Sequence, residues 1–141
     1  MTGYLLDTNV ISELRKRKPE PRVVAFVNGA PLAGLHLSDV TIAEIRYGIE
    51  RTADPLKRAS IEGWLDRTLR PMFQGRILAV SEEVILRWRL MVEAGRRQGK
   101  TFAQPDLFIA ATASVHGLTV VTRNGRDFTD TGVGVLDPWK R

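Results

Sequence analysis

Residues 4–13 read YLLDTNVISE, in which an apolar triplet is followed without a linker by a helix-like segment. The triplet predicts a short strand at 4–6. The helix predicted after it ends in the basic run RKRK at 15–18, where Pro19 and Pro21 stop it. A strand that leads directly into a helix is the repeating unit of α/β folds.

The rest of the chain repeats this alternation. Further strands are predicted at 35–37, 77–80, 118–122 and 133–136. Further helices are predicted at 23–28, from Thr41 past Ile49, from Pro55 to Pro71, from Ser81 up to a polar, basic stretch at 95–104, and at 105–115. Strands that alternate with helices predict one α/β domain over residues 1–141, with a mainly parallel central sheet flanked by helices.

Three of the predicted helix boundaries rest on specific signals. Thr41 and Glu44 have the spacing of a capping box, so that helix is expected to begin at Thr41. Pro71 is expected to end the helix that begins at Pro55. Ser81 is expected to cap the following helix, because acids fill its first turn.

Composition and length place the chain among globular proteins. Its 141 residues, 43% of them hydrophobic, suffice to bury one core. No apolar run approaches the roughly 20 residues of a membrane span, and the start lacks the pattern of a secretory signal. The absence of cysteine excludes disulfides, thiol catalysis and cysteine-ligated zinc. We therefore expect a cytoplasmic protein without a membrane anchor.

The charge balance is basic, with 21 Lys and Arg against 16 Asp and Glu and a formal charge of +5. Arginine predominates, and its planar guanidinium suits phosphate groups. This composition favours a polyanionic partner, although arginine-rich codon usage would explain it equally well.

Several common active sites are absent from the sequence. It contains neither the Gly-Lys-Ser/Thr of a P-loop nor the GxSxG of a hydrolase. Gly132-Val133-Gly134 lacks the third glycine of a dinucleotide site and is expected to form a turn. His36 and His116 have no cysteine partners and are weak zinc candidates. A phosphorylated receiver domain would need an aspartate after the third strand, where Ser81 stands.

Four acids remain as candidates because they stand at or near the ends of predicted strands. Asp7 directly follows the first strand, Glu44 lies in the first turn of the helix after the second, and Asp127 follows the fourth. Ligands of an open parallel sheet bind beyond the carboxyl ends of its strands. These three acids are therefore expected at that edge. Asp106, which opens the helix before the fourth strand, joins them only if the loop before it carries it there.

Such acids would suit a divalent cation. Carboxylates that crowd together repel one another and raise each other's pKa. Mg²⁺ or Mn²⁺ relieves this repulsion, since both prefer oxygen ligands. The bound ion lowers the pKa of a water and polarises a phosphoryl oxygen, while the remaining acids orient that water or accept its proton.

Each acid also has a purely structural interpretation. Asp7 and Asp106 suit helix N-termini, where a carboxylate accepts hydrogen bonds from backbone N–H groups. Glu44 would complete the capping box, and Asp127 would form an Asx-turn. Position in the sequence leaves both interpretations open.

Four segments of the chain resemble the four acidic motifs of the PIN domain family, in the family's order. They read YLLDTNVISE at 4–13, VTIAEIRYGI at 40–49, PDLFIAATA at 105–113 and VTRNGRDF at 121–128. The resemblance covers essentially the whole chain. Within the family, the chain resembles more narrowly the VapC and FitB branch of type II toxin–antitoxin systems. It implies an endoribonuclease toxin that hydrolyses RNA phosphodiester bonds with a metal-activated water.

The resemblance also implies roles for individual residues. It assigns four acids to a catalytic cluster at the carboxyl edge of the sheet: Asp7, Glu44, Asp106 and Asp127. The direct ligands of Mg²⁺ or Mn²⁺ are expected to be Asp7 and Asp106. Neighbouring polar residues are expected to orient the acids or the metal's waters by hydrogen bonds. These residues are Thr8, Asn9, Thr122 and Asn124.

As partners, the resemblance implies an RNA substrate, a homodimer and a small cognate antitoxin that blocks the acidic site. The apolar helix pair from Thr41 to Pro71 is a candidate dimer surface, unless it packs against the domain's own core. The alternative function is a weakly active or inactive PIN protein that acts with its antitoxin in a DNA-bound regulatory complex. Since the chain shows no helix-turn-helix, operator DNA would be contacted only through the antitoxin.

RNA contacts have several candidates in the sequence. Arg96, Arg97 and Lys100 are expected either to meet the RNA backbone or to form a solvated face. The basic run at 15–18 would do the same, or would stabilise a helix C-terminus. Stacking of single-stranded bases needs an exposed aromatic ring. The candidates for it are Tyr47, Phe102 and Phe128.

Overall fold

Five parallel strands form one sheet in the computed structural model, which describes residues 3–102 and 104–140. They are β1 (Tyr4–Leu6), β2 (Leu35–Ser38), β3 (Ile77–Leu78), β4 (Thr119–Val121) and β5 (Val135–Leu136). Their order across the sheet is β3-β2-β1-β4-β5. The predicted parallel sheet is confirmed, and the segment that follows β1 starts at the middle of its carboxyl edge.

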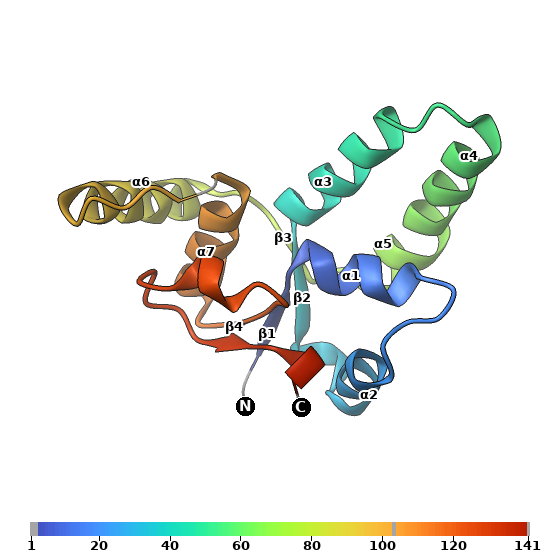
Figure 1. Ribbon diagram of the computed structural model, residues 1–141, viewed down its shortest axis with the longest axis horizontal. Coiled ribbons are helices and arrows are strands. Elements are labelled where there is room, and N and C mark those ends of the chain that lie inside the picture. The colour runs from blue at the N-terminus through green and yellow to red at the C-terminus, as the bar shows by residue number, and fades with distance from the viewer. Residues whose placement is uncertain (1–2, 103, 141) are drawn as a thin grey trace.

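Helices cover both faces of this sheet. They are α1 (Thr8–Arg15), α2 (Pro21–Gly29), α3 (Asp39–Glu50), α4 (Pro55–Trp64), α5 (Arg70–Met72), α6 (Glu82–Arg97) and α7 (Gln104–His116). Short 3₁₀ helices lie at η1 (Leu32–Gly34), η3 (Gly125–Phe128) and η4 (Pro138–Lys140). Figure 1 shows α6 and α7 on one side of the sheet, α1 and α2 on the other, and α3 and α4 projecting as a pair. No helix within the described ranges is both long and apolar enough to cross a membrane.

Strand side chains alternate between two hydrophobic clusters, one on each face of the sheet. Leu5 and Val120 pack with Ile109 of α7, whereas Leu6 and Val121 belong to the cluster that includes α1 and α2. All five side chains are buried. Successive strand residues point to opposite faces, so a strand covered on both faces is apolar throughout. This explains why the opening triplet shows no polar alternation.

Helix α3 begins before the predicted capping box, and that prediction is wrong. The Ser38 hydroxyl caps the helix by accepting a hydrogen bond from the Val40 N–H (3.0 Å). Thr41 is buried inside the first turn, where its hydroxyl accepts a hydrogen bond from Thr8 Oγ1 (3.3 Å). Glu44 therefore lies in the second turn of α3, too far along to cap it.

The helix that begins at Pro55 continues past the predicted stop at Pro71. A π-helical turn, η2 (Leu65–Leu69), follows α4, and the Arg70 N–H bonds to the Leu65 carbonyl. Pro71 then stands at the start of the short segment α5. Proline is tolerated there because the N–H groups at the start of a helical segment need no partner within it.

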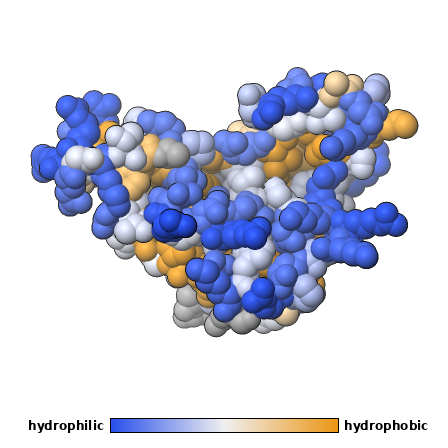
Figure 2. All heavy atoms as spheres, in the orientation of Figure 1, coloured by the Kyte–Doolittle hydropathy of each residue, from blue (hydrophilic) through white to orange (hydrophobic). Residues whose placement is uncertain are grey.

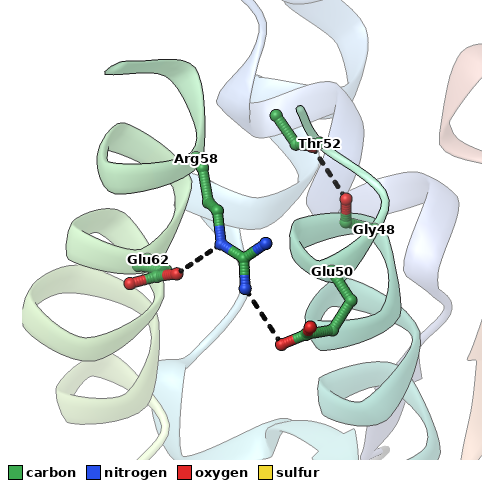
Figure 3. Close-up of polar contacts among 5 residues, drawn as sticks. All are labelled: Gly48, Glu50, Thr52, Arg58 and Glu62. Carbon is green, nitrogen blue, oxygen red and sulfur yellow. Dashed lines mark hydrogen bonds and ion pairs between the residues drawn. The ribbon is translucent and has the colours of Figure 1, made fainter. Parts of the chain in front are cut away.

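Helix α4 is tied to α3 by a charged network. The Arg58 guanidinium donates to Glu62 on its own helix and to Glu50 on α3, both at 3.2 Å (Figure 3). Exposed ion pairs contribute little free energy each. The position of α4 depends more on Ile61 and Trp64, which pack against the core.

The start of α6 is as predicted, and α7 ends at His116, one residue beyond the predicted 105–115. The Ser81 hydroxyl caps α6, and Gly117 follows α7 with a φ of +65°, the left-handed conformation that favours glycine. Helix α6 continues to Arg97, further than the sequence indicated. Gly95 lets its last turn approach Phe102, since a Cβ there would come within 2.9 Å of the ring.

Candidate active site

A pocket of about 430 Å³ is lined by residues that follow the carboxyl ends of the strands. Asp7 stands directly after β1, and Glu44 lies on α3, which follows β2. Asp106 lies in the first turn of α7 and lines the same pocket. The loop before α7 therefore does carry Asp106 to this edge, and three of the four predicted acids share one pocket.

The fourth acid, Asp127, lies on η3 and is not part of the pocket lining. Its side chain is exposed, and its N–H bonds to the Asn124 carbonyl (2.9 Å). Its charge still reaches the pocket. After burial, the negative charge of Asp127 is one of the causes that raise the pKa of Asp7 and of Asp106.

Asp7 is the most firmly held of the acids. It is only 7% exposed and occupies the N-cap of α1. Its Oδ1 accepts a hydrogen bond from the Thr8 N–H (2.8 Å), and its Oδ2 accepts one from the Thr122 hydroxyl (2.9 Å). Burial raises the pKa of Asp7, and these two hydrogen bonds oppose the rise by favouring the carboxylate.

The polar residues beside the acids form one network around Thr122. Asn9 Nδ2 and the Asn124 N–H donate to the Thr122 hydroxyl (3.0 and 3.1 Å), while the hydroxyl donates to Asp7. One donor and two acceptor sites are all that a hydroxyl offers. Asn9 Oδ1 accepts from the Arg123 N–H (3.3 Å), which orients the amide. The network locks the Asp7 carboxylate between β4 and α1.

Burial and neighbouring negative charges disfavour the ionised form of Asp106. Burial raises the pKa of Asp106 to about 6, and the charges of Asp7, Asp127 and Glu44 add to the rise. Among the described residues, no hydrogen bond to the Asp106 carboxylate offsets this rise in pKa. At neutral pH an ionised Asp106 therefore carries an unfavourable free energy that a cation would remove.

The donor set of this pocket fits a hard divalent cation. The three acids offer oxygen ligands, and no histidine lines the pocket. Within residues 3–102 and 104–140, no three acidic or histidine side chains are arranged to hold one ion together. Mg²⁺ commonly takes one or two protein carboxylates and keeps several waters. Two direct ligands therefore suit this pocket better than the closed set of a structural zinc site.

The pocket also has a basic side, which the sequence did not connect with the acids. Glu13, Lys16, Arg123 and Trp139 line it. Asn9, Glu13 and Lys16 recur at intervals of four and three residues, which places them on one face of α1 and its end. That spacing is the signal that could have revealed Glu13 and singled out Lys16 within the basic run at 15–18, which was already a candidate for RNA contact. Arg123 and Trp139 meet only because η4 brings Trp139 back to the end of β4.

The other residues expected to meet RNA do not line this pocket. Arg96 and Lys100 pair with nearby acids at the surface. Phe128 is 2% exposed and belongs to the core, so it is excluded from the three candidates for base stacking. Tyr47 is 60% exposed and remains a candidate for base stacking, with the Arg51 guanidinium 5.5 Å from its ring centroid.

An apolar groove of about 320 Å³ adjoins the acidic pocket. Helices α1, α3 and α4 form it, and Figure 2 shows apolar surface beneath the projecting helix pair. Ile11, Ile45, Ile61 and Trp64 line the groove. It shares Thr8, Ser12 and Glu44 with the acidic pocket, so the two hollows meet at those residues.

The chain matches the PIN domain family over residues 4–134. It is 38% identical to toxin FitB of Neisseria gonorrhoeae over 135 residues, which are 96% of this chain and 97% of FitB. It is 32% identical to VapC ribonuclease Y4jK of Sinorhizobium fredii over 136 residues, which are 96% of this chain and 97% of that protein.

Solved structures agree with these matches. The crystal structure of FitAcB from Neisseria gonorrhoeae is similar with a TM-score of 0.92 and 38% identity, over 98% of this chain and 99% of that chain. The structure of FitAB bound to an IR36 DNA fragment is similar with a TM-score of 0.89 and 37% identity, over 96% and 95% of the two chains. The chain therefore belongs to the PIN domain family, in the branch of the FitB and VapC toxins.

Proposed function

We propose that the protein is an endoribonuclease toxin of a type II toxin–antitoxin system, acting on cellular RNA in the cytoplasm. The observation that carries this proposal is the pocket shared by Asp7, Glu44 and Asp106, in which the pKa of Asp106 is raised to about 6. Carboxylates that repel one another in this way gain free energy from a divalent cation between them. The names of FitB and Y4jK, a toxin and a ribonuclease, support the same function.

In this proposal Asp7 and Asp106 hold Mg²⁺ or Mn²⁺, and the Thr122 hydroxyl fixes the Asp7 carboxylate. When bound, such an ion lowers the pKa of a water and polarises a phosphoryl oxygen. Glu44 makes no hydrogen bond with the rest of the described chain, and we assign to it the proton of the water that attacks phosphorus. Asp127 contributes through its charge alone.

We further propose that a cognate antitoxin occupies the apolar groove beside the pocket. An apolar segment seated against Ile45 and Ile61 would cover Thr8 and Glu44, which belong to both hollows. Access of RNA to the acids would then be blocked. Any contact with operator DNA would be made through this antitoxin.

A homodimer is also part of the proposal. The outer side of the α3–α4 pair remains a candidate surface, because Tyr47 and Leu56 are 60% and 83% exposed there. Helix α6 offers a second apolar surface, made by Ile85, Leu86 and Leu90. Truncating each surface separately and measuring the mass in solution would decide between them.

A second candidate function is a regulatory complex on DNA in which this chain has little nuclease activity. It is favoured by one observation, the similarity to FitAB bound to a DNA fragment. That similarity concerns the fold of the chain and leaves its acids unexplained. The nuclease therefore remains the leading proposal.

Cleavage of total cellular RNA tests the nuclease directly. Purified protein is assayed in Mn²⁺ with and without EDTA, beside Asp106→Asn and a control, Asp66→Asn, whose carboxylate is exposed on η2 and pairs with Arg70. We expect discrete fragments from the wild type and the control, only with metal, and none from Asp106→Asn. Absence of cleavage by a folded, metal-binding wild type would favour the regulatory complex instead.

A further inference from the structure

The basic side of the pocket is organised around a buried anion, Glu13, which is 6% exposed. Its Oε1 accepts from Lys16 Nζ (2.9 Å) and its Oε2 accepts from the Glu20 N–H (2.9 Å). Lys16 and the Glu20 N–H hold the pKa of Glu13 below its usual value. Each carboxylate oxygen of Glu13 thus has a partner, and the bond to Lys16 holds the ammonium beside the pocket.

Two cations on this side keep donors available to a ligand. The Lys16 ammonium has three hydrogens and is bonded only to Glu13 within the described chain; its side chain is 58% exposed. The Arg123 guanidinium lies over the Trp139 ring, 5.4 Å from the centroid, and makes no hydrogen bond or ion pair with the described residues. Stacking on an aromatic ring leaves the edge of a guanidinium, which carries its donors, open.

These cations do not neutralise the three acids across the pocket. Neither Lys16 nor Arg123 forms an ion pair with Asp7, Glu44 or Asp106 in the part of the chain that is described. The pocket therefore separates a cluster of carboxylates from a pair of cations with open donors. A polyanion that reaches the carboxylates meets repulsion there, and it gains charge-assisted hydrogen bonds only on the basic side.

We propose that Lys16 and Arg123 form a binding subsite for an RNA backbone phosphate adjacent to the scissile one, with Glu13 and Trp139 as positioning residues. This inference rests on the proposed nuclease function, because it takes RNA as the ligand. Anchoring the neighbouring phosphate draws the scissile phosphate toward the acids. The register of the RNA strand in the pocket is then set by this subsite.

Binding of RNA without cleavage tests the subsite. A short, fluorescent single-stranded RNA is titrated in EDTA over a range of KCl concentrations, with anisotropy as the readout. Lys16→Gln and Arg123→Gln should each weaken binding about fivefold, and the double variant should lower the slope of log K against log salt by about 0.7, the value for one phosphate contact on a single strand. The control Arg70→Gln removes a cation that pairs with Asp66 outside the pocket and should change neither.

The outcomes separate this subsite from the nuclease itself. Loss of binding in the two variants, with a wild type that does not cleave RNA, would support the subsite and contradict the nuclease. Unchanged binding and salt slope in folded variants, with a wild type that cleaves, would overturn the subsite alone. A wild type that binds no RNA, or a loss with Arg70→Gln as large as with Lys16→Gln, would also overturn it.

A double-mutant comparison tests the positioning role of Glu13. Glu13→Gln keeps an oxygen for the Glu20 N–H but releases Lys16, so the KM for RNA should rise about threefold while kcat changes little. In the Lys16→Gln background the same substitution should add nothing to KM. A merely structural role would give additive losses and a lower kcat, and either result would contradict the assignment.

Discussion

The two ends of the sheet carry pockets of similar size and opposite chemistry. At the carboxyl edge, about 430 Å³ is lined by Asp7, Glu44 and Asp106. At the amino edge, about 320 Å³ is lined by small and apolar residues with two histidines, His36 and His116, and by no acid. Size therefore does not distinguish a candidate active site in this protein. What distinguishes the candidate active site is that its pocket holds mutually repelling charges.

Chain direction explains the difference. Strands β1 and β2 lead straight into α1 and α3, whose N-termini are capped by Asp7 and Ser38. Asp106 lies in the first turn of α7. Helix N-termini thus gather at the carboxyl edge, where their dipoles favour anions. These dipoles help the fold to tolerate a cluster of carboxylates at the carboxyl edge. The amino edge lacks them and could not stabilise such a cluster.

The largest effect expected from this comparison is on catalysis. Glu44→Gln should lower kcat for RNA cleavage by about 100-fold or more, since it removes the proposed proton acceptor from inside the pocket. Asp127→Asn should cost only about tenfold, because Asp127 lies outside the lining and acts through charge. Single-turnover cleavage of one RNA by both variants measures the ratio. A larger loss of kcat with Asp127→Asn than with Glu44→Gln would contradict the distinction between acids that line the pocket and Asp127, which lies outside it.

The second effect is a gain of stability when repulsion is removed. Burial and the neighbouring acids raise the pKa of Asp106 to about 6, so Asp106→Asn should stabilise the metal-free protein at pH 7. After allowance for solvent screening and for the lost charge at a helix N-terminus, we expect about 1 kcal/mol. Chemical denaturation in EDTA measures the change in the free energy of unfolding.

The pH dependence of that gain provides its control. Because the folded-state pKa of Asp106 lies above its usual value, the folded protein loses stability as the pH rises from 3.8 through about 6. The gain from Asp106→Asn should therefore be present at pH 7 and absent below about pH 4. A gain that is equal at both pH values would show that charge repulsion is not its cause.

A smaller effect of opposite sign is expected from Glu13, on the basic side of the pocket. Lys16 and the Glu20 N–H lower the pKa of Glu13 from 4.5. The stability that this acid contributes is therefore present above pH 4.5 and is lost as the pH falls through its lower folded-state pKa. Glu13→Gln should lower the Tm by about 2 °C at pH 7. Thermal unfolding in acid should show no difference, and a constant difference would contradict the ion-pair account.

The smallest effect is expected at the amino edge. His36 Nδ1 is buried without a hydrogen-bond partner in the described chain, and His36 lines the amino-edge pocket rather than the one that holds the acids. His36→Leu should change the free energy of unfolding by no more than about 0.5 kcal/mol, because it removes an unpaired polar atom and restores apolar contact. RNA cleavage should stay at the wild-type rate. A large loss of cleavage would mean that the two edges are coupled.

Much of the fold could be predicted because local signals and tertiary packing agree. The apolar triplet before Asp7 and the Ser81 cap each specify one local structure. Predictions failed where another residue competed for the same role. Ser38 is the N-cap of α3 in place of Thr41, because its hydroxyl accepts a hydrogen bond from an N–H of the first turn.

The site was predictable only in part. The acids stand next to strand ends, and the resemblance to PIN domains supplied the place of Asp106, which the loop before α7 left open. The basic side combines residues that lie far apart in the chain, since Arg123 and Trp139 meet only when η4 returns to the end of β4. No pattern within one segment records such a contact. The spacing of the acids in the sequence likewise could not predict that Asp127 is exposed.

Titration of the metal-free protein with Mn²⁺ in a calorimeter tests the central claim most directly, namely that the crowded carboxylates of the carboxyl edge form a divalent cation site. At pH 7 we predict binding to the wild type and to the control Asp66→Asn. Binding to Asp106→Asn should be weaker by about tenfold or more, since one of two direct ligands is lost. Equal affinity in Asp106→Asn and the wild type would contradict the claim.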